Sequence, residues 1–186
     1  MNRYLKYFIT GITLILGGTS CMKEKLEATY TNQEAKIDQY VSSNKYTDSS
    51  KTDSLRVVYN GGSTRLVLTE GIGEELNAKG IAAIYYAGYV FNGSKTNANL
   101  FITNHEETAK NAGWTLTDEN FDIYMVKMGE TRLIEGLKSG LLGVKGGEHS
   151  VILFSGKYGF GDEEFGIIPA NSALLYEIWV EAVSND

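Results

Sequence analysis

Short apolar and aromatic runs, separated by turn residues, follow one another along the chain after residue 54, which is typical of β-strands. These runs predict strands over 55–60, 64–69, 81–91, 100–103, 121–126, 149–155 and 173–183. Gly61-Gly62, between the first two strands, is typical of a hairpin turn. In the last strand the apolar residues share one face and Glu177 and Glu181 lie on the other, so we expect that one face of the sheet sees water.

Helical spacing of apolar residues is confined to short segments. It predicts one helix over 131–138, which Gly140 would end, and a modest amphipathic helix over 24–41. Asn104 followed three residues later by Glu107 is typical of a third helix start. Strands and helices do not alternate regularly, which favours an antiparallel sheet. The pattern therefore predicts an α+β fold, in which a twisted antiparallel sheet packs on one short helix.

The first 21 residues have the composition of a bacterial export signal. Arg3 and Lys6 precede an apolar run over 7–16, and small residues lead to Cys21. Ten residues of helix rise about 15 Å, half of a hydrocarbon core of about 30 Å, so the run is too short to span a membrane. The segment resembles a lipoprotein signal, which implies that 1–20 is removed and that Cys21 is lipidated. The alternative is an ordinary signal peptide with a leftover cysteine.

The residues after Cys21 predict a tether, a helix and a polar linker over 21–54, followed by one domain over 55–186. Met22-Lys23-Glu24-Lys25 resembles the charged tether of surface lipoproteins in Bacteroidetes, and 42–54 consists almost entirely of Ser, Thr, Asn, Asp and Lys. We expect a location in the cell envelope of a Gram-negative bacterium, on the periplasmic face or the outer surface. Contact with the membrane would be made through the lipid anchor only.

Composition and charge narrow the possible functions. Lys and Arg number 17 against 23 Asp and Glu, a net charge of −6, which argues against nucleic acid as a partner. Apolar residues make up 42% of the 186 residues and charged residues 22%, an ordinary globular mix. One cysteine and two histidines argue against a metal site or a Cys/His nucleophile pair. We expect neither a metal nor another cofactor.

Motifs in the second half of the chain follow one another in a specific order. They are Tyr85-Tyr86-Ala87-Gly88, Leu133-Ile134-Glu135-Gly136-Leu137, Tyr158-Gly159-Phe160-Gly161 and Gly166-Ile167-Ile168-Pro169-Ala170. This order and spacing resembles the FKBP-type peptidyl-prolyl cis-trans isomerases over about residues 55–186. An upstream loop, Gly71-Ile72-Gly73, agrees with the same family. The resemblance implies a five- or six-stranded antiparallel sheet wrapped round one short helix, in accord with the pattern of strands and helices.

The resemblance also implies a site, namely an aromatic cup between helix and sheet that binds a prolyl ring or a macrolide. It assigns catalytic roles to Tyr86, Phe101 and Phe160. The residues that it assigns to substrate binding are Tyr124, Leu133, Ile134, Leu137, Ile168 and Tyr176. Leu137 takes the place of a tryptophan on the floor of the cup, and Phe160 that of a tyrosine whose hydroxyl donates to a carbonyl. The backbone at Leu133 and Ile134 would hold the ligand.

The strand after the long turn has two possible registers against the family pattern of Phe-Asp. Counting on from Gly93 selects Thr96-Asn97, whereas matching residue types selects Phe101-Ile102 and needs a longer hairpin. We favour the second register because it keeps the aromatic wall. In both registers the acidic residue is absent. An insertion over about 104–120, with Trp114, would border the pocket and cover or extend it.

The resemblance implies isomerisation of X-Pro bonds in proline-containing polypeptide segments. The barrier of about 18–20 kcal/mol arises from amide resonance, so an apolar cup that removes water and prefers the twisted amide lowers it without a nucleophile. Two polar contributors are missing, the acid and the hydroxyl at Phe160. Each absent hydrogen bond costs about 0.5–1.5 kcal/mol, or about threefold to tenfold in rate. We therefore expect weakened activity.

Two other functions remain open on the sequence. The same cup would serve a non-catalytic FKBP-like peptide-binding or chaperone lipoprotein, or the insertion near Trp114 would bind a partner or glycan through exposed aromatic residues. Aromatic residues in strands are also more often core packing than site. Tyr86, Tyr124, Phe160 and Tyr176 would then be ordinary core residues.

Overall fold

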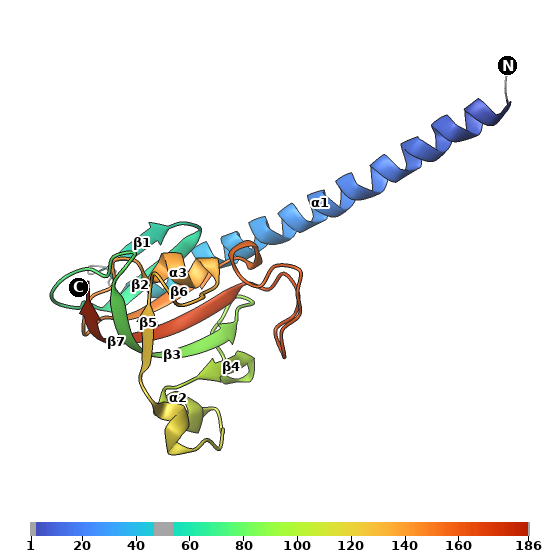
Figure 1. Ribbon diagram of the computed structural model, residues 1–186. Coiled ribbons are helices and arrows are strands. Elements are labelled where there is room, and N and C mark those ends of the chain that lie inside the picture. The colour runs from blue at the N-terminus through green and yellow to red at the C-terminus, as the bar shows by residue number, and fades with distance from the viewer. Residues whose placement is uncertain (1–2, 47–53, 186) are drawn as a thin grey trace.

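The computed structural model describes the backbone of residues 3–46 and 54–185, and the side chains of these ranges from residue 22 onward. Within these residues seven strands form one antiparallel sheet, in the order β1-β2-β6-β7-β3-β4, with β5 also paired to β3 (Figure 1). The strands are β1 (Val57–Asn60), β2 (Ser63–Thr69), β3 (Ile81–Val90), β4 (Leu100–Thr103), β5 (Tyr124–Lys127), β6 (His149–Phe154) and β7 (Leu174–Ser184).

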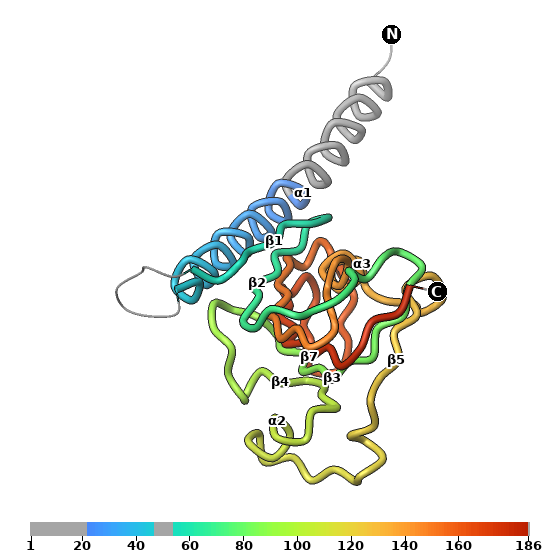
Figure 2. The backbone as a smooth tube through the Cα atoms, turned by 90° about the vertical axis from the view of Figure 1, so that its left-hand side faces the viewer, coloured from blue at the N-terminus to red at the C-terminus, as the bar shows by residue number. Residues whose placement is uncertain are grey.

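The sheet curls round the short helix α3 (Glu135–Leu141), as Figure 2 shows. This arrangement confirms the predicted α+β fold. The sheet has seven strands rather than five or six because two strands share one edge of β3. Strand β5 pairs with residues 81–84 of β3, and β4 pairs with residues 87–89. The insertion between β4 and β5, with α2 (Glu106–Asn111), extends from the sheet at the end opposite α1 (Figure 2).

Helix α3 lies directly against β6 because it presents glycine to the sheet. A Cβ atom at Gly136 would overlap the ring of Phe154, and one at Gly140 would overlap Ile152. The helix begins later than the predicted range of 131–138, since Ile134 is still extended (φ −63°, ψ 146°). Gly140 consequently lies inside the helix instead of ending it, because it is needed there as a contact residue.

The outer face of the sheet is largely covered, which corrects the prediction that it sees water. Helix α1 (Arg3–Asn44), which is longer than predicted, places Ile37 and Val41 in a second apolar cluster on this face. The outward-facing side chains that it covers include Val151, Leu153 and Leu175. Glu177, expected in water, is only 7% exposed, and its carboxylate contacts Lys95 at 2.7 Å and His149 at 3.0 Å.

The side chains of the predicted signal segment, residues 1–20, and of Cys21 lie outside the described residues, as do residues 47–53 of the predicted linker. In the part of the chain that the structure covers, no helix combines the length and apolarity needed to cross a membrane. The polar segment that follows α1 returns to the domain through a bridge between Tyr46 and Ser54. Short 3-10 turns, η1 (Asn97–Asn99), η2 (Asp118–Phe121) and η3 (Gly156–Tyr158), complete the secondary structure.

A buried ion pair ties the end of α3 to the sheet. The Arg65 side chain is 3% exposed and the Glu148 side chain is fully buried, with 3.2 Å between Nε and Oε1. The Arg65 guanidinium also donates to the carbonyls of Gly140, Leu142 and Gly143, which the end of the helix leaves without partners. Burial raises the pKa of Glu148 and lowers that of Arg65, although each charge attracts the other.

We predict that Glu148→Gln lowers the free energy of unfolding by about 3–5 kcal/mol, because it leaves a buried guanidinium without its counter-charge. The matched control is Glu70→Gln in the pair between Arg56 and Glu70, whose side chains are 39% and 59% exposed. That change should cost less than about 1 kcal/mol. Chemical denaturation measures both, and equal losses would contradict the role given to the buried pair.

Stacked rings hold the start of the insertion on the outer face. The His105 ring stacks on Trp179 of β7, with centroids 3.9 Å apart, and the His149 ring also stacks on Trp179, at 4.9 Å. His105 Nδ1 lies 2.9 Å from Thr108 Oγ1. Burial lowers the pKa of His105 below its ordinary 6.5, and the His149 ring lowers it further. The nearby carboxylates of Glu107 and Glu177 raise this pKa but do not cancel the shift.

The lowered pKa of His105 predicts that the folded domain becomes less stable in acid. Unfolded His105 binds a proton near pH 6.5 and folded His105 only at lower pH, so the unfolding free energy should fall as the pH drops below about 6.5. His105→Phe keeps a ring on Trp179 but cannot bind a proton. The variant should therefore lose less stability than the wild type between pH 7 and pH 5 in denaturant titrations. Parallel curves for the two proteins would refute this assignment.

Candidate functional site

A pocket of about 160 Å³ lies between α3 and the inner face of the sheet. Residues of strands β3, β5 and β7, Leu137 of α3 and Ile102 of β4 contribute to its lining. Its lining consists of Ile84, Tyr86, Ile102, Tyr124, Val126, Leu133, Leu137, Tyr176 and Ile178. We call it the inner pocket. The tyrosine hydroxyls are its only polar side-chain groups.

A second, larger hollow of about 390 Å³ adjoins the inner pocket and shares Ile102 and Tyr176 with it. We call it the outer groove. The loop after η3 and Trp114 of the insertion form much of its wall. Its full lining is Leu100, Phe101, Ile102, Trp114, Phe160, Phe165, Gly166, Ile167, Ile168 and Tyr176. None of the residues that line the two cavities carries a charge.

The residues predicted for one cup are divided between the two cavities. Those that line the inner pocket are Tyr86, Tyr124, Leu133, Leu137 and Tyr176, and those that line the outer groove are Phe101, Phe160, Ile168 and again Tyr176. Ile134 lines neither, but packs against the main core at the start of α3. Sequence reasoning missed Ile84, Val126 and Ile178, although strand alternation places Ile178 on the same face as Tyr176.

Edge-to-face ring contacts connect the strands that frame the site. The Tyr86 and Tyr124 ring centroids lie 5.9 Å apart at 71°, and those of Phe101 and Tyr176 lie 5.8 Å apart at 86°. Both arrangements are favourable for aromatic pairs. Burial raises the pKa of Tyr86 and, more strongly, that of Tyr176, so both hydroxyls stay protonated and able to donate at neutral pH.

Strand β4 has the register in which Phe101 and Ile102 face the cavities. Thr103 pairs with Ala87, and Ile102 with Gly88. Asn97, the candidate of the other register, lies in η1 and donates through its side chain to the Asn111 carbonyl at 2.8 Å. The position next to Phe101 is thus an isoleucine that is 40% exposed, at the wall that the inner pocket and the outer groove share.

The side chain of Asn104 fills the gap between β4 and β5 along the edge of β3. Its Oδ1 accepts from the Tyr86 backbone N–H at 2.6 Å, and its Nδ2 donates to the carbonyls of Ile84 at 3.2 Å and Asp122 at 3.0 Å. Asn104 is 5% exposed. Asn104 therefore positions Tyr86 and the chain that leads to Tyr124. The sequence predicted that Asn104 caps a helix, but α2 follows His105 instead.

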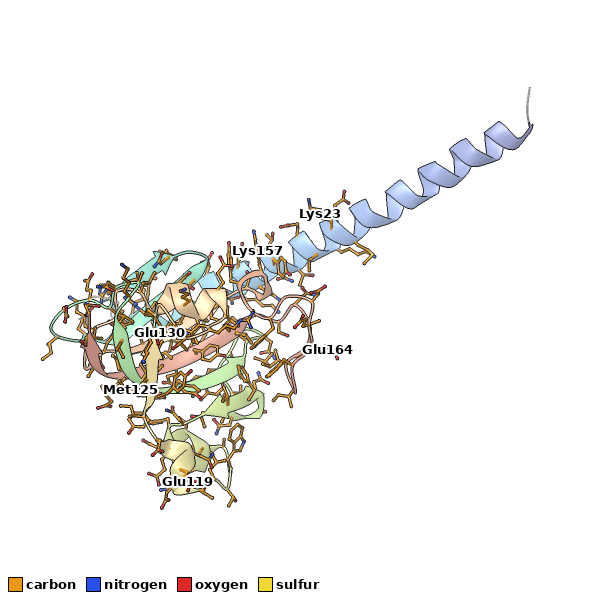
Figure 3. The ribbon with its side chains drawn as sticks, viewed as in Figure 1. Lys23, Glu119, Met125, Glu130, Lys157 and Glu164 are labelled. Carbon is orange, nitrogen blue, oxygen red and sulfur yellow. The ribbon has the colours of Figure 1, made fainter. Side chains whose placement is uncertain are left out.

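Several exposed apolar side chains surround the two cavities. On the β5 side they are Ile123, Tyr124 and Met125, with exposures of 38%, 42% and 51%, and on the loop after η3 they are Phe165 and Ile167, at 65% and 63%. Figure 3, in which Met125 and Glu164 are labelled, shows both segments. Among the described residues no group of His, Cys, Asp and Glu side chains could hold a metal ion.

Comparison with known proteins identifies the class to which this fold and pocket belong. Residues 74–181 match the family described as FKBP-type peptidyl-prolyl cis-trans isomerase. The match spans more than half of the chain, so the chain belongs to this family.

Two fungal relatives agree. FK506-binding protein 1 of Aspergillus oryzae is 27% identical over 117 residues, which cover 63% of this chain and 94% of the relative. FK506-binding protein 2 of Aspergillus fumigatus is 35% identical over 63 residues, 32% of this chain and 47% of the relative.

Solved structures show the same fold. The three FKBP domains of wheat FKBP73 match with a TM-score of 0.57 and 24% identity, over 72% of this chain and 53% of that protein. This chain thus spans about half of the wheat protein. FkpA from Escherichia coli matches with a TM-score of 0.53 and 17% identity, over 99% of this chain and 73% of the other. At these identities the similarity speaks for the fold alone.

We predict that Asn104→Ala destabilises the domain, because each buried backbone group left without a partner costs about 1–3 kcal/mol. Asn97→Ala, which removes one exposed side-chain hydrogen bond, should cost less than about 1 kcal/mol. Denaturant unfolding compares the two. The amide resonance of Tyr86 should move in Asn104→Ala only, and similar effects of both changes would contradict the bridging role of Asn104.

Proposed function

We propose that the chain is a peptidyl-prolyl cis-trans isomerase of the cell envelope, with weakened activity, that acts on X-Pro bonds in polypeptide segments. The observation that carries the proposal is the inner pocket. It is apolar, free of charge, open at Ile102 and framed by aromatic rings, which suits a prolyl ring.

Desolvation and preferential binding of the twisted amide supply the mechanism. The planar amide is the more polar form, because resonance separates charge between oxygen and nitrogen. Transfer from water to a carbon-lined pocket removes the solvation of that form, whereas the twisted form has less to lose. The inner pocket holds the ring while the carbonyl on its far side turns, so the barrier falls without a covalent step.

The side chains around the pocket have distinct roles in this proposal. The Tyr86 hydroxyl, which is protonated at neutral pH as an ordinary tyrosine is, donates to the turning carbonyl. Leu137 and Tyr176 contact the prolyl ring, and the backbone of Leu133 and Ile134 holds the chain beside it. Phe101, Phe160 and Ile168 bound the outer groove, which receives the polypeptide on one side of the proline.

Two substitutions account for the weakened activity. Ile102 stands where the family pattern has an acid, and Phe160 stands where it has a tyrosine hydroxyl. Both side chains lie at the cavities but offer no hydrogen bond to a rotating carbonyl. Each absent bond lowers the rate by about threefold to tenfold.

Location and ligands complete the proposal. Lipidation at Cys21 would anchor the chain to a membrane of a Gram-negative envelope, and residues 22–29 of α1 form an exposed spacer of about 12 Å before Tyr30 meets the domain. The two fungal relatives are FK506-binding proteins by name, which supports a macrolide as a second ligand of the pocket.

The direct test is the isomerisation rate of a prolyl peptide with residues 22–186, with and without FK506. We expect acceleration over the uncatalysed rate that FK506 abolishes. Ile102→Asp restores an acid and should raise the rate by about threefold to tenfold. Ile102→Leu, which keeps an apolar side chain of the same size and offers no hydrogen bond, is the control and should not. A wild-type rate equal to that without protein would refute the isomerase.

A non-catalytic peptide-binding or chaperone role is the second candidate. The exposed apolar side chains around the cavities favour it, because they offer contact area to an extended segment whether or not a bond turns. This role predicts that prolyl peptides bind without rate enhancement and that Ile102→Asp creates activity. A partner or glycan site on the insertion has less support than these two functions. Trp114 lines the outer groove and packs on the outer-face cluster, so its ring is not a free surface aromatic.

A further inference from the structure

The loop over 159–171, which we call the wall loop, carries a large part of the outer groove. Phe160, Phe165 and Ile168 come from it, and the rings of Phe160 and Phe165 stack with centroids 5.3 Å apart. Within the loop, the backbone groups of Phe165 and Ile168 exchange hydrogen bonds of 3.0 and 2.9 Å. Ile168 is 2% exposed in the main core and Phe160 packs against it, so the middle of the loop is anchored there and the placement of the remainder depends on what holds its two ends.

The wall loop follows η3 directly, and its last residue, Asn171, returns to contact Gly156, the first residue of η3. A Cβ atom at Gly156 would overlap the Asn171 backbone, so only glycine allows this approach. Asn171 has a φ of 57°, a left-handed conformation that few residues other than glycine adopt. The Asn171 N–H closes the loop by donating to the Gly161 carbonyl at 2.5 Å.

Helix α1 contacts both ends through one side chain. The Gln33 Oε1 accepts from the Gly156 N–H at 2.8 Å, and the Gln33 Nε2 donates to the Asn171 carbonyl at 2.6 Å. One turn earlier, the Tyr30 hydroxyl donates to Asn171 Oδ1 at 2.7 Å, and Tyr30 is 8% exposed. The amide of Gln33 is suited to this position because it donates and accepts at once.

The apolar anchors of α1 determine which of its side chains meet the loop. Tyr30, Gln33, Ile37 and Val41 recur at intervals of three and four residues, so they share one helix face. Ile37 and Val41 are 3% and 4% exposed in the outer-face cluster. Their burial fixes the rotation of the helix and directs Gln33 and Tyr30 to the ends of the wall loop.

We infer that Gln33 and Tyr30 are positioning residues of the site, through which the N-terminal helix holds the wall loop in the conformation that forms the outer groove. The effect on substrate rests on the proposed function, but the effect on the loop does not. Because affinity falls with the fraction of molecules in the competent conformation, loosening the loop raises KM and leaves kcat nearly unchanged.

The test uses the chain with α1 intact and compares Gln33→Ala with Gln39→Ala, an exposed glutamine on the same helix. Hydrogen exchange is followed at the amides of Phe165 and Ile168, neither of which bonds to Gln33. Loss of two hydrogen bonds should speed exchange there by about tenfold. Exchange in β7 should stay as in the wild type, and Gln39→Ala should change neither region. Tyr30→Phe keeps the ring and removes one bond, so it should have the same effect to a smaller degree.

Three outcomes would overturn the inference. The first is that the exchange rates of Phe165 and Ile168 are unchanged in Gln33→Ala. The second is that exchange rates rise equally throughout the domain. The third is that exchange in the loop becomes faster while KM for the prolyl peptide does not rise. If the wild type turns over no prolyl peptide, the proposed isomerase fails. The affinity for FK506 then replaces KM, and a weaker affinity in Gln33→Ala alone would still support the positioning role.

Discussion

The close approach of α3 to β6 is the contact on which the rest of the structure depends. Gly136 and Gly140 bring the helix backbone onto Phe154 and Ile152, and the Arg65 guanidinium holds the carbonyls at the end of the helix. A helix held this tightly places Leu137 in the lining of the inner pocket. The space between helix and sheet is therefore a property of backbone packing as much as of the side chains that line it.

The site consists of two adjoining apolar cavities, an arrangement better suited to binding a polypeptide than to binding a small polar molecule. A small apolar pocket lies beside a longer apolar groove, and one wall serves both. No charged side chain lines either cavity, since Glu177 and Lys95 lie on the opposite face of the sheet and the pair of Arg65 and Glu148 lies at the end of α3. Membership of the FKBP-type family agrees with this separation, because rotation about an amide bond needs neither an ionised group nor a metal.

Helix α1 relates the segment before the domain to the site. It buries the outer face of the sheet, which would otherwise expose Leu153 and Leu175, and the same face of the helix reaches the wall loop. Helix α1 thus both stabilises the sheet and positions the wall loop. An apolar contact fixes the helix, and the fixed helix lets two polar side chains act on a loop more than 120 residues away in sequence.

The sequence by itself determined the elements whose signal is local. Short apolar runs between turn residues placed β4 over Leu100–Thr103 as observed and most other strands to within a few residues, and the motif around Ile168 and Pro169 indicated the family. These features depend on residue type and spacing along one segment, so they are readable before the chain folds.

Only the tertiary structure decided the features that depend on two distant segments. Asn104 is a natural helix cap by its residue type, yet it bridges two strands because β4 and β5 separate beside β3. Glu177 is a surface residue by alternation, yet it is buried beneath partners that the connection between β3 and β4 and strand β6 supply. The division of the predicted cup into two cavities has the same cause. Which side chains share a cavity is set by long-range packing, and no local spacing encodes that.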